Sequence, residues 1–141
     1  MTVQTRVYVP LTVSALRRLG TSGHLEPAPF TAYAVTTDLR REYPNADEEE
    51  LEFLAFTDAA TTSTTGTGPA LVVAAADVDA DVVTDLLAPA AAVSAVRVAT
   101  ALPRRQVASF HVANAEPGSD GRPDYSWYDA TEIEAVLDLL R

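Results

Sequence analysis

Two residues in the segment VASFHV, at positions 107–112, have side chains that could perform hydrolytic chemistry. Ser109 and His111 are two positions apart, so in an extended strand both point to one face, which they share with Val107 and Ala113. An imidazole beside a serine hydroxyl can accept its proton and activate the oxygen as a nucleophile. The G-x-S-x-G turn of many hydrolases is absent, so the residue types fit a hydrolase but the motif is incomplete.

The same pair also fits a purely structural role, and both interpretations stay open. A general base needs a carboxylate partner and a cleft, and the sequence places neither beside His111. If the protein is a small metal-independent hydrolase or a ligand-binding enzyme, we expect its site near His111 and the segment 114–126. The candidate catalytic residues are then Ser109, His111 and Arg105.

No metal or cofactor site is predicted. The aspartates of DVDAD, at 77–81, imitate the opening of a calcium-binding loop. Val82 stands where that loop needs glycine, however, and Ala88 stands where it needs a bidentate glutamate. The segment GTGPA, at 66–70, lacks the lysine and the spacing of a phosphate-binding loop, so we interpret it as a turn.

Trp127 and Tyr128 follow a polar segment, precede the last predicted helix, and are the candidate interface residues. Amphipathic aromatic side chains are enriched in protein interfaces. They also cover hydrophobic cores, and Tyr128 is positioned to pack against Ile133 as a hydrophobic staple. The sequence leaves open whether this pair contacts a partner or closes the core.

The composition excludes several functions. The 141-residue chain has a net charge of −10, a pI near 4.4 and no lysine, so it should repel phosphate backbones, and we expect no nucleic-acid binding. Cysteine is absent, which excludes thiolate nucleophiles, disulfides and cysteine zinc sites. The chain has no signal-peptide pattern and no run of 18 apolar residues. We therefore expect a cytoplasmic protein without a membrane segment.

The strongest local signal predicts a helix within NADEEELEFLAFTDAA, at 45–60. Asp47 and Glu50 form a capping box at its start, and the acidic residues of the first turn complement the helix dipole. Its apolar side chains fall into two sets on different sides of the helix, which are Phe53, Phe56 and Ala60, and Leu51, Leu54 and Ala55. A helix that is apolar on two sides should pack against two partners.

Alternation and turn residues place the other elements. Strands are expected at 5–10, 30–35, 70–76, 94–100 and 106–113. Shorter helices are expected at 12–20, where Gly20 ends the helix in the left-handed conformation, at 36–43, at 79–87 and at 129–140, where Asp129 and Glu132 form a second capping box. Polar, glycine-rich segments predict mobile loops near 61–69 and 114–126.

These elements predict a single α+β domain over residues 1–141, with a mixed sheet of about five strands and four to five helices. The strands at 5–10 and 30–35 are joined through a helix, which suggests a parallel pair. The strands at 94–100 and 106–113 are close in sequence and should pair antiparallel.

Four segments together carry a resemblance to a known family. They are RVYVPLT, AYAVTTDLRREYPNADEEELEFLAFTDAA, VASFHV and WYDATEIEAVLDLL. In order and spacing they resemble an uncharacterised family, a domain of unknown function found in small acidic actinobacterial proteins. The resemblance spans most of the chain, except the threonine-rich loop and residues 79–92. It implies an actinobacterial, cytoplasmic source and brings no activity, cofactor or active-site residue with it.

Complete packing signals beside incomplete catalytic motifs favour one function over the other. We expect a soluble, non-enzymatic interaction or regulatory module that acts by contact with another protein or with itself as a homo-oligomer. The competing hypothesis is the enzyme built near His111.

Overall fold

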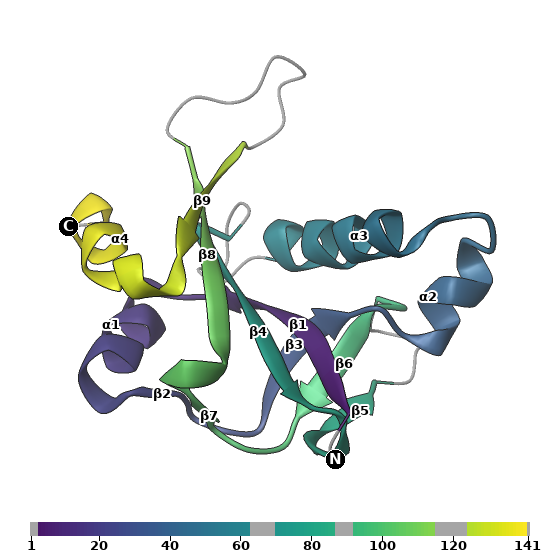
Figure 1. Cartoon of the computed structure of the whole chain (residues 1–141), viewed down its shortest axis with the longest axis horizontal. Coiled ribbons are helices and arrows are strands. Elements are labelled where there is room, and N and C mark those ends of the chain that lie inside the picture. Colours follow the sequence, from purple (N-terminus) through teal and green to yellow (C-terminus); the bar gives the residue numbers. More distant parts are fainter. Residues whose placement is uncertain (1–2, 63–69, 87–91, 115–123, 141) are drawn as a thin grey trace.

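The computed structural model describes residues 3–62, 70–86, 92–114 and 124–140, and its framework is a sheet of seven antiparallel strands (Figure 1). The strand order is β5-β6-β3-β1-β4-β8-β9. The bounds are β1 Gln4–Leu11, β3 Phe30–Ala34, β4 Val72–Asp79, β5 Val83–Asp85, β6 Ala95–Val98, β8 Val107–Ala113 and β9 Tyr125–Asp129. A second, two-stranded sheet joins β2, His24–Leu25, to β7, Leu102–Pro103.

Four α-helices and three short 3-10 turns complete the described part of the chain. The helices are α1 Val13–Ser22, α2 Thr37–Glu42, α3 Glu48–Thr61 and α4 Ile133–Leu139, and the turns are η1 Ala80–Val82, η2 Arg104–Gln106 and η3 Ala130–Glu132. Among these described elements, no helix combines the length and the apolar character needed to cross a lipid bilayer. The α+β class is confirmed.

The two faces of the seven-stranded sheet carry different helices (Figure 1). Leu16 of α1 and Ile133 of α4 are buried in a cluster on one face, together with Val7 of β1. Leu51 of α3 is buried in a cluster on the other face, together with Tyr8 of β1. The alternation along β1 therefore assigns its neighbouring side chains to two separate cores, as a period of two requires.

The helix starts follow the sequence signals. Thr12, Thr36 and Asp47 cap α1, α2 and α3, and the Asp47 carboxylate accepts a hydrogen bond from the Glu50 backbone N–H at 2.8 Å. The predicted end of the first helix is wrong. Gly20 lies inside α1, and Gly23, with φ 79°, is the left-handed residue that ends it.

The sheet is larger than predicted, and its pairing differs from the predicted mixed sheet. β1 and β3 are antiparallel neighbours, because α1 and the segment after it return the chain to the end of the sheet where β1 finished. The strands at 94–100 and 106–113 do not pair with each other. β6 pairs with β3 and β5, while β8 pairs with β4 and β9, since β7 and η2 carry the chain across the fold.

Two other predicted elements are corrected. Within the segment predicted as a helix at 79–87, residues 80–85 form the short turn η1 and then edge strand β5, which suits the adjacent β-branched residues Val82 and Val83, while residue 87 lies outside the described residues. The predicted loop at 114–126 overlaps strand β9, because its prolines and glycines all precede residue 124 and β-forming aromatics follow. Most of the loops predicted near 61–69 and 114–126 lies outside the described residues.

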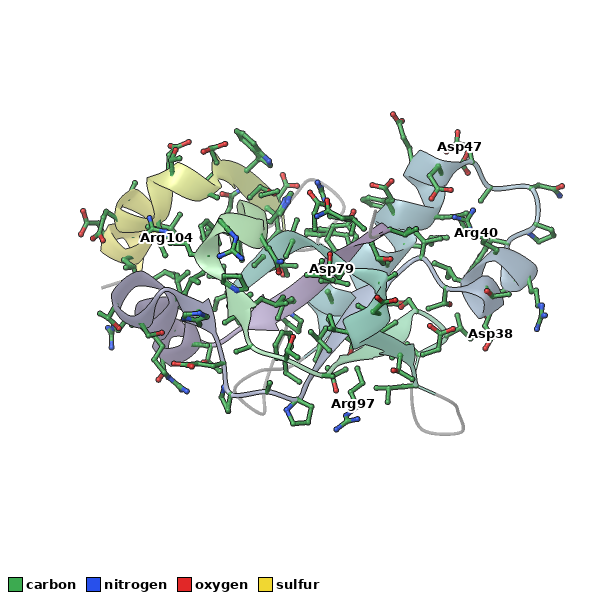
Figure 2. The ribbon with its side chains drawn as sticks, turned by 60° about the horizontal axis from the view of Figure 1, so that its bottom comes forward. Asp38, Arg40, Asp47, Asp79, Arg97 and Arg104 are labelled. Atoms are coloured by element: carbon green, nitrogen blue, oxygen red, sulfur yellow. The ribbon has the colours of Figure 1, made fainter. Side chains whose placement is uncertain are left out.

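Charged side chains lie mainly on the surface. Asp38, Asp47, Arg97 and Arg104, labelled in Figure 2, are all exposed. The sheet and helices thus form an apolar interior beneath a charged shell, as burial energetics require.

Substitution of Phe110 tests whether these residues form the core. Its side chain is 1% exposed, so Phe110→Ala should lower the free energy of unfolding by about 3–5 kcal/mol. The matched control is Phe53→Ala on α3, whose side chain is 66% exposed and whose loss should cost less than about 0.5 kcal/mol. Chemical denaturation followed by circular dichroism measures both values. Equal destabilisation by the two substitutions would contradict the packing described above.

Candidate functional site

A groove of about 1010 Å³ lies between α3 and the β8–β9 part of the sheet. It exists because α3 packs over β1, β3 and β4, while β8 and β9 extend the same face beyond the helix. The lining residues are Arg6, Tyr8, Glu52, Phe53, Leu54, Phe56, Thr57, Ala60, Thr61, Ser109, His111, Asp124, Tyr125 and Trp127.

Two large aromatic side chains of this groove are exposed. Phe53 on α3 is 66% exposed, and Trp127 on β9 is 61% exposed. Scattered apolar residues on a surface need no explanation, but two exposed aromatics that line one groove form a patch suited to recognition. The core role considered for Trp127 is therefore wrong.

The floor of the groove is a cluster of rings around Phe56. Its ring centroid lies 4.9 Å from that of His111, 5.5 Å from that of Tyr125 and 5.9 Å from that of Tyr8, and the two tyrosine contacts are edge-to-face. The Tyr125 hydroxyl donates to the carbonyl oxygen of Ala70 at 2.6 Å. This network joins β9 to the centre of the fold beneath the groove.

A hydroxyl and a carboxylate meet at the border of the groove. The Tyr8 hydroxyl donates to Glu52 Oε2 at 3.3 Å. Burial of Tyr8, followed by the negative charge of Glu52, raises the pKa of the phenol to about 12. Tyr8 therefore keeps its proton at neutral pH, where it donates a hydrogen bond and cannot act as a general base.

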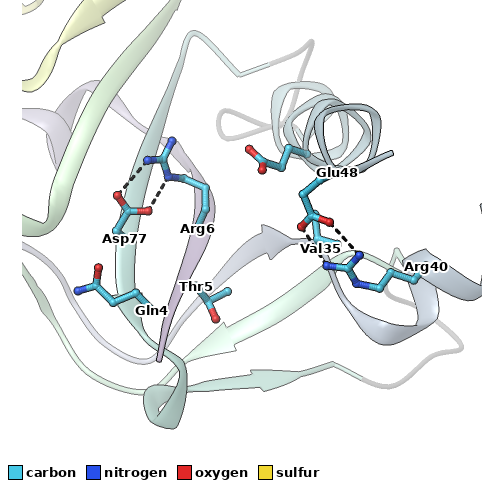
Figure 3. A pocket seen from close by; sticks show the side chains of 8 residues that line it. Gln4, Thr5, Arg6, Val35, Arg40, Glu48 and Asp77 are labelled. Atoms are coloured by element: carbon cyan, nitrogen blue, oxygen red, sulfur yellow. Dashed lines mark hydrogen bonds and ion pairs between the residues drawn. The ribbon is translucent and has the colours of Figure 1, made fainter. Parts of the chain in front are cut away.

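A smaller polar pocket of about 450 Å³ adjoins the groove and shares Arg6 and Glu52 with it (Figure 3). The Arg6 guanidinium holds both carboxylate oxygens of Asp77, at 2.7 and 2.9 Å. Arg40 holds Glu48 in the same two-bonded way, at 2.8 and 2.9 Å. Each arginine is therefore offset by its own carboxylate.

This pairing leaves the groove with a surplus of negative charge. Glu52 and Asp124 line it, and neither forms an ion pair within the described residues. The positive charge of Arg6 is offset by Asp77. The site therefore favours a cationic group over an anion.

The predicted pair Ser109 and His111 does lie in this groove. Ser109 Oγ is 3.3 Å from His111 Nε2, but the serine is only 5% exposed. Within the described ranges, no carboxylate hydrogen-bonds to His111 to orient the imidazole. Burial, and then the charge of Arg6, lower the pKa of His111, so the ring is neutral at pH 7. The pair has hydrolase residue types without the third group that catalysis needs.

A β-bulge changes which residues share this face. Ser109 pairs with Ala75 of β4, but Val107 pairs with the next residue, Ala76, so β8 contains one extra residue between them. Val107 consequently packs in the cluster with Phe110, on the far face from His111. The expectation that Val107 shares the face of His111 is wrong.

The other predicted site residues are dispersed. Arg105 lies exposed in η2 and is not part of the groove, where Arg6 supplies the guanidinium instead. Tyr128 packs against the cluster that contains Ile133, as the staple requires, so it and Trp127 occupy different faces of β9.

Sequence reasoning missed Arg6, Tyr8 and Glu52 as groove residues, and it treated Phe53 and Phe56 only as packing residues. One signal pointed to the aromatics. The helix was apolar on two sides, yet only one side of α3 is covered by the sheet. The prediction that this helix packs against two partners is therefore wrong for the described structure, where Phe53 faces solvent.

The described residues offer no cluster suited to a metal ion. Within the described ranges, no group of three or more histidine, cysteine, aspartate or glutamate side chains is arranged to hold one. Among the aspartates at 77–81, the Asp77 carboxylate already forms an ion pair with Arg6.

Comparison with known proteins identifies a family. A family model described as a family of unknown function (DUF6912) matches residues 5–125, from the second residue of β1 to the first residue of β9. No curated protein and no solved structure matches the chain significantly.

His111 should make stability depend on pH. Because burial lowers its pKa in the folded state below the ordinary 6.5, the unfolded chain binds a proton first as the pH falls. The stability that the neutral ring contributes is fully present above about pH 6.5 and is lost progressively below it. Denaturation of wild type and His111→Gln between about pH 5 and 8 should show the wild type losing more stability on acidification. Parallel profiles would show that His111 is not held neutral by the fold.

Proposed function

Because the chain belongs to the DUF6912 family of unknown function, its function must be argued from the groove, and we propose that it is a protein-binding module. The groove between α3 and β8–β9 binds a segment of a partner protein that combines apolar side chains with arginine or lysine. The protein acts by this contact and not by chemistry on the partner.

One observation carries the proposal: Phe53 and Trp127 stand exposed in a groove whose floor is already aromatic. Large aromatic side chains in such positions supply most of the binding free energy in many interfaces. Burying them in a partner would remove their apolar surface from water.

The charge and size of the groove support the same kind of occupant. Glu52 and Asp124 can pair with cationic side chains, while Arg6 is already held by Asp77. A volume of about 1010 Å³ is at the upper limit of pockets that enclose small molecules, which is roughly 300–1,000 Å³. An open groove of this size suits a chain segment better than a compact metabolite.

Selection from a display library of random linear peptides tests the proposal. We expect wild type to enrich peptides that combine apolar residues with arginine or lysine. Trp127 is the only tryptophan, so burial by a peptide should shift its emission to shorter wavelength and report occupancy of the groove directly. Phe53→Ala should weaken binding at least about tenfold. Glu52→Gln should weaken it and reduce its dependence on salt.

Two matched variants control for surface changes elsewhere. Leu139→Ala removes an exposed apolar side chain from α4, and Glu50→Gln removes an acidic charge from α3 outside the groove. Both should bind the selected peptides as wild type does. Failure to select any peptide, or selected peptides that ignore Phe53→Ala and Glu52→Gln, would refute the proposed groove.

The contact between Ser109 and His111 is the observation that favours a second candidate function, a metal-independent hydrolase. The burial of Ser109 and the absence of a described acid partner for His111 count against it. A fluorophosphonate probe should therefore leave wild-type Ser109 unlabelled in mass spectrometry. Labelling that disappears in Ser109→Ala and falls in His111→Gln would establish an enzyme and replace the binding proposal.

A further inference from the structure

The outer edge of β9 lies beside the groove and is unpaired. β9 is the last strand of the sheet, and its described residues form a ladder only with β8. An edge strand presents free N–H and C=O groups that can receive another strand. Which groups are free follows from the pairing with β8.

The hydrogen-bond phase turns the backbone of Trp127 outward. The Asn114 N–H donates to the Asp124 carbonyl at 2.7 Å, whereas the Ala113 N–H donates away from β9, to Leu71 on the β4 side, at 2.8 Å. Bonded and non-bonded pairs alternate along an antiparallel ladder. His111 and Trp127 are therefore a non-bonded pair, and Trp127 directs both its N–H and its C=O to the open edge.

Tyr125 has the same phase as Trp127, so its backbone also faces outward. Further along, the Asp129 N–H is already taken by the Glu132 side chain at 3.1 Å. The free edge is thus short and centred on Trp127, whose side chain lines the groove. Backbone pairing and side-chain anchoring are available at one residue.

The surrounding charge selects the occupant. The described residues 124–129 contain two acidic residues, Asp124 and Asp129, and no basic residue, and Glu52 lines the groove beside them. A second copy paired through the same edge would place these acidic segments side by side, which like-charge repulsion opposes. A strand with arginine or lysine would complement them.

We infer that the partner segment binds as an extended strand added to β9, with its basic side chains beside these carboxylates and its apolar side chains directed into the groove. This inference rests on the proposed function and specifies its mode. Strand addition gives affinity through main-chain hydrogen bonds and specificity through alternate side chains. The added strand would continue the sheet beyond β9 and cover the exposed indole of Trp127.

Methylation of the peptide backbone tests strand addition on the wild-type protein. In peptides selected as above, N-methylation of one set of alternate residues should weaken binding at least about tenfold per lost hydrogen bond, and methylation of the other set should not. Equal tolerance of both sets would overturn the inference. If peptide binding in that case is still weakened by Phe53→Ala and Glu52→Gln, the proposed groove function stands.

A proline substitution tests the same edge from the protein side. Trp127→Pro and Trp127→Ala both remove the indole, but only proline also removes the outward N–H, and the β8–β9 ladder does not use that donor. Trp127→Pro should retain the far-ultraviolet circular dichroism of Trp127→Ala and bind the peptide about tenfold more weakly. Equal affinities would overturn the inference. So would concentration-dependent dimerisation of wild type in light scattering that Trp127→Pro abolishes, because a second copy would then occupy the edge.

Discussion

The site depends on the close packing of α3 against the central strands through small side chains. Ala55, Ala59 and Ala60 of α3 are buried in one cluster with Val73 and Ala75 of β4. Small residues let the helix backbone approach the sheet, and interior packing density penalises any gap between them. Once α3 is fixed over β1, β3 and β4, it cannot also cover β8 and β9.

This constraint leaves part of the sheet face uncovered, and the proposed binding surface lies there. β8 and β9 continue the face beyond the helix, so their side chains there meet a groove in place of a second helix. The ring contact between Phe56 of α3 and Tyr125 of β9 joins the helix to the uncovered part of the sheet. The Tyr125 hydroxyl also hydrogen-bonds to the backbone carbonyl oxygens of Ala60 and Ala70. A floor supported in this way is preorganised, which lowers the entropy lost when a partner binds.

Charge pairing determines the sign of the site more than composition does. A chain with net charge −10 could still form an anion site if two arginines faced an open pocket. Here Arg6 and Arg40 each hold a carboxylate through two hydrogen bonds, so neither is available without breaking a charge-assisted pair. Glu52 and Asp124 form no ion pair among the described residues, and on this the proposed preference for a cationic partner rests.

The sequence by itself determined the local structure: the caps at Thr12 and Asp47, the staple of Tyr128, and the alternation of β1 between two faces, while it left the cap of α2 open between Thr36, which the structure shows, and Thr37. These features depend on neighbours within a few residues, and so does the proximity of Ser109 to His111. Strand order, the bulge in β8 and the edge position of β9 were decided only by the tertiary structure, because pairing joins residues far apart in the chain. The groove belongs to the second group. Arg6, Glu52 and Trp127 come from three distant segments, and no local pattern specifies that the packing of α3 leaves them around one open space.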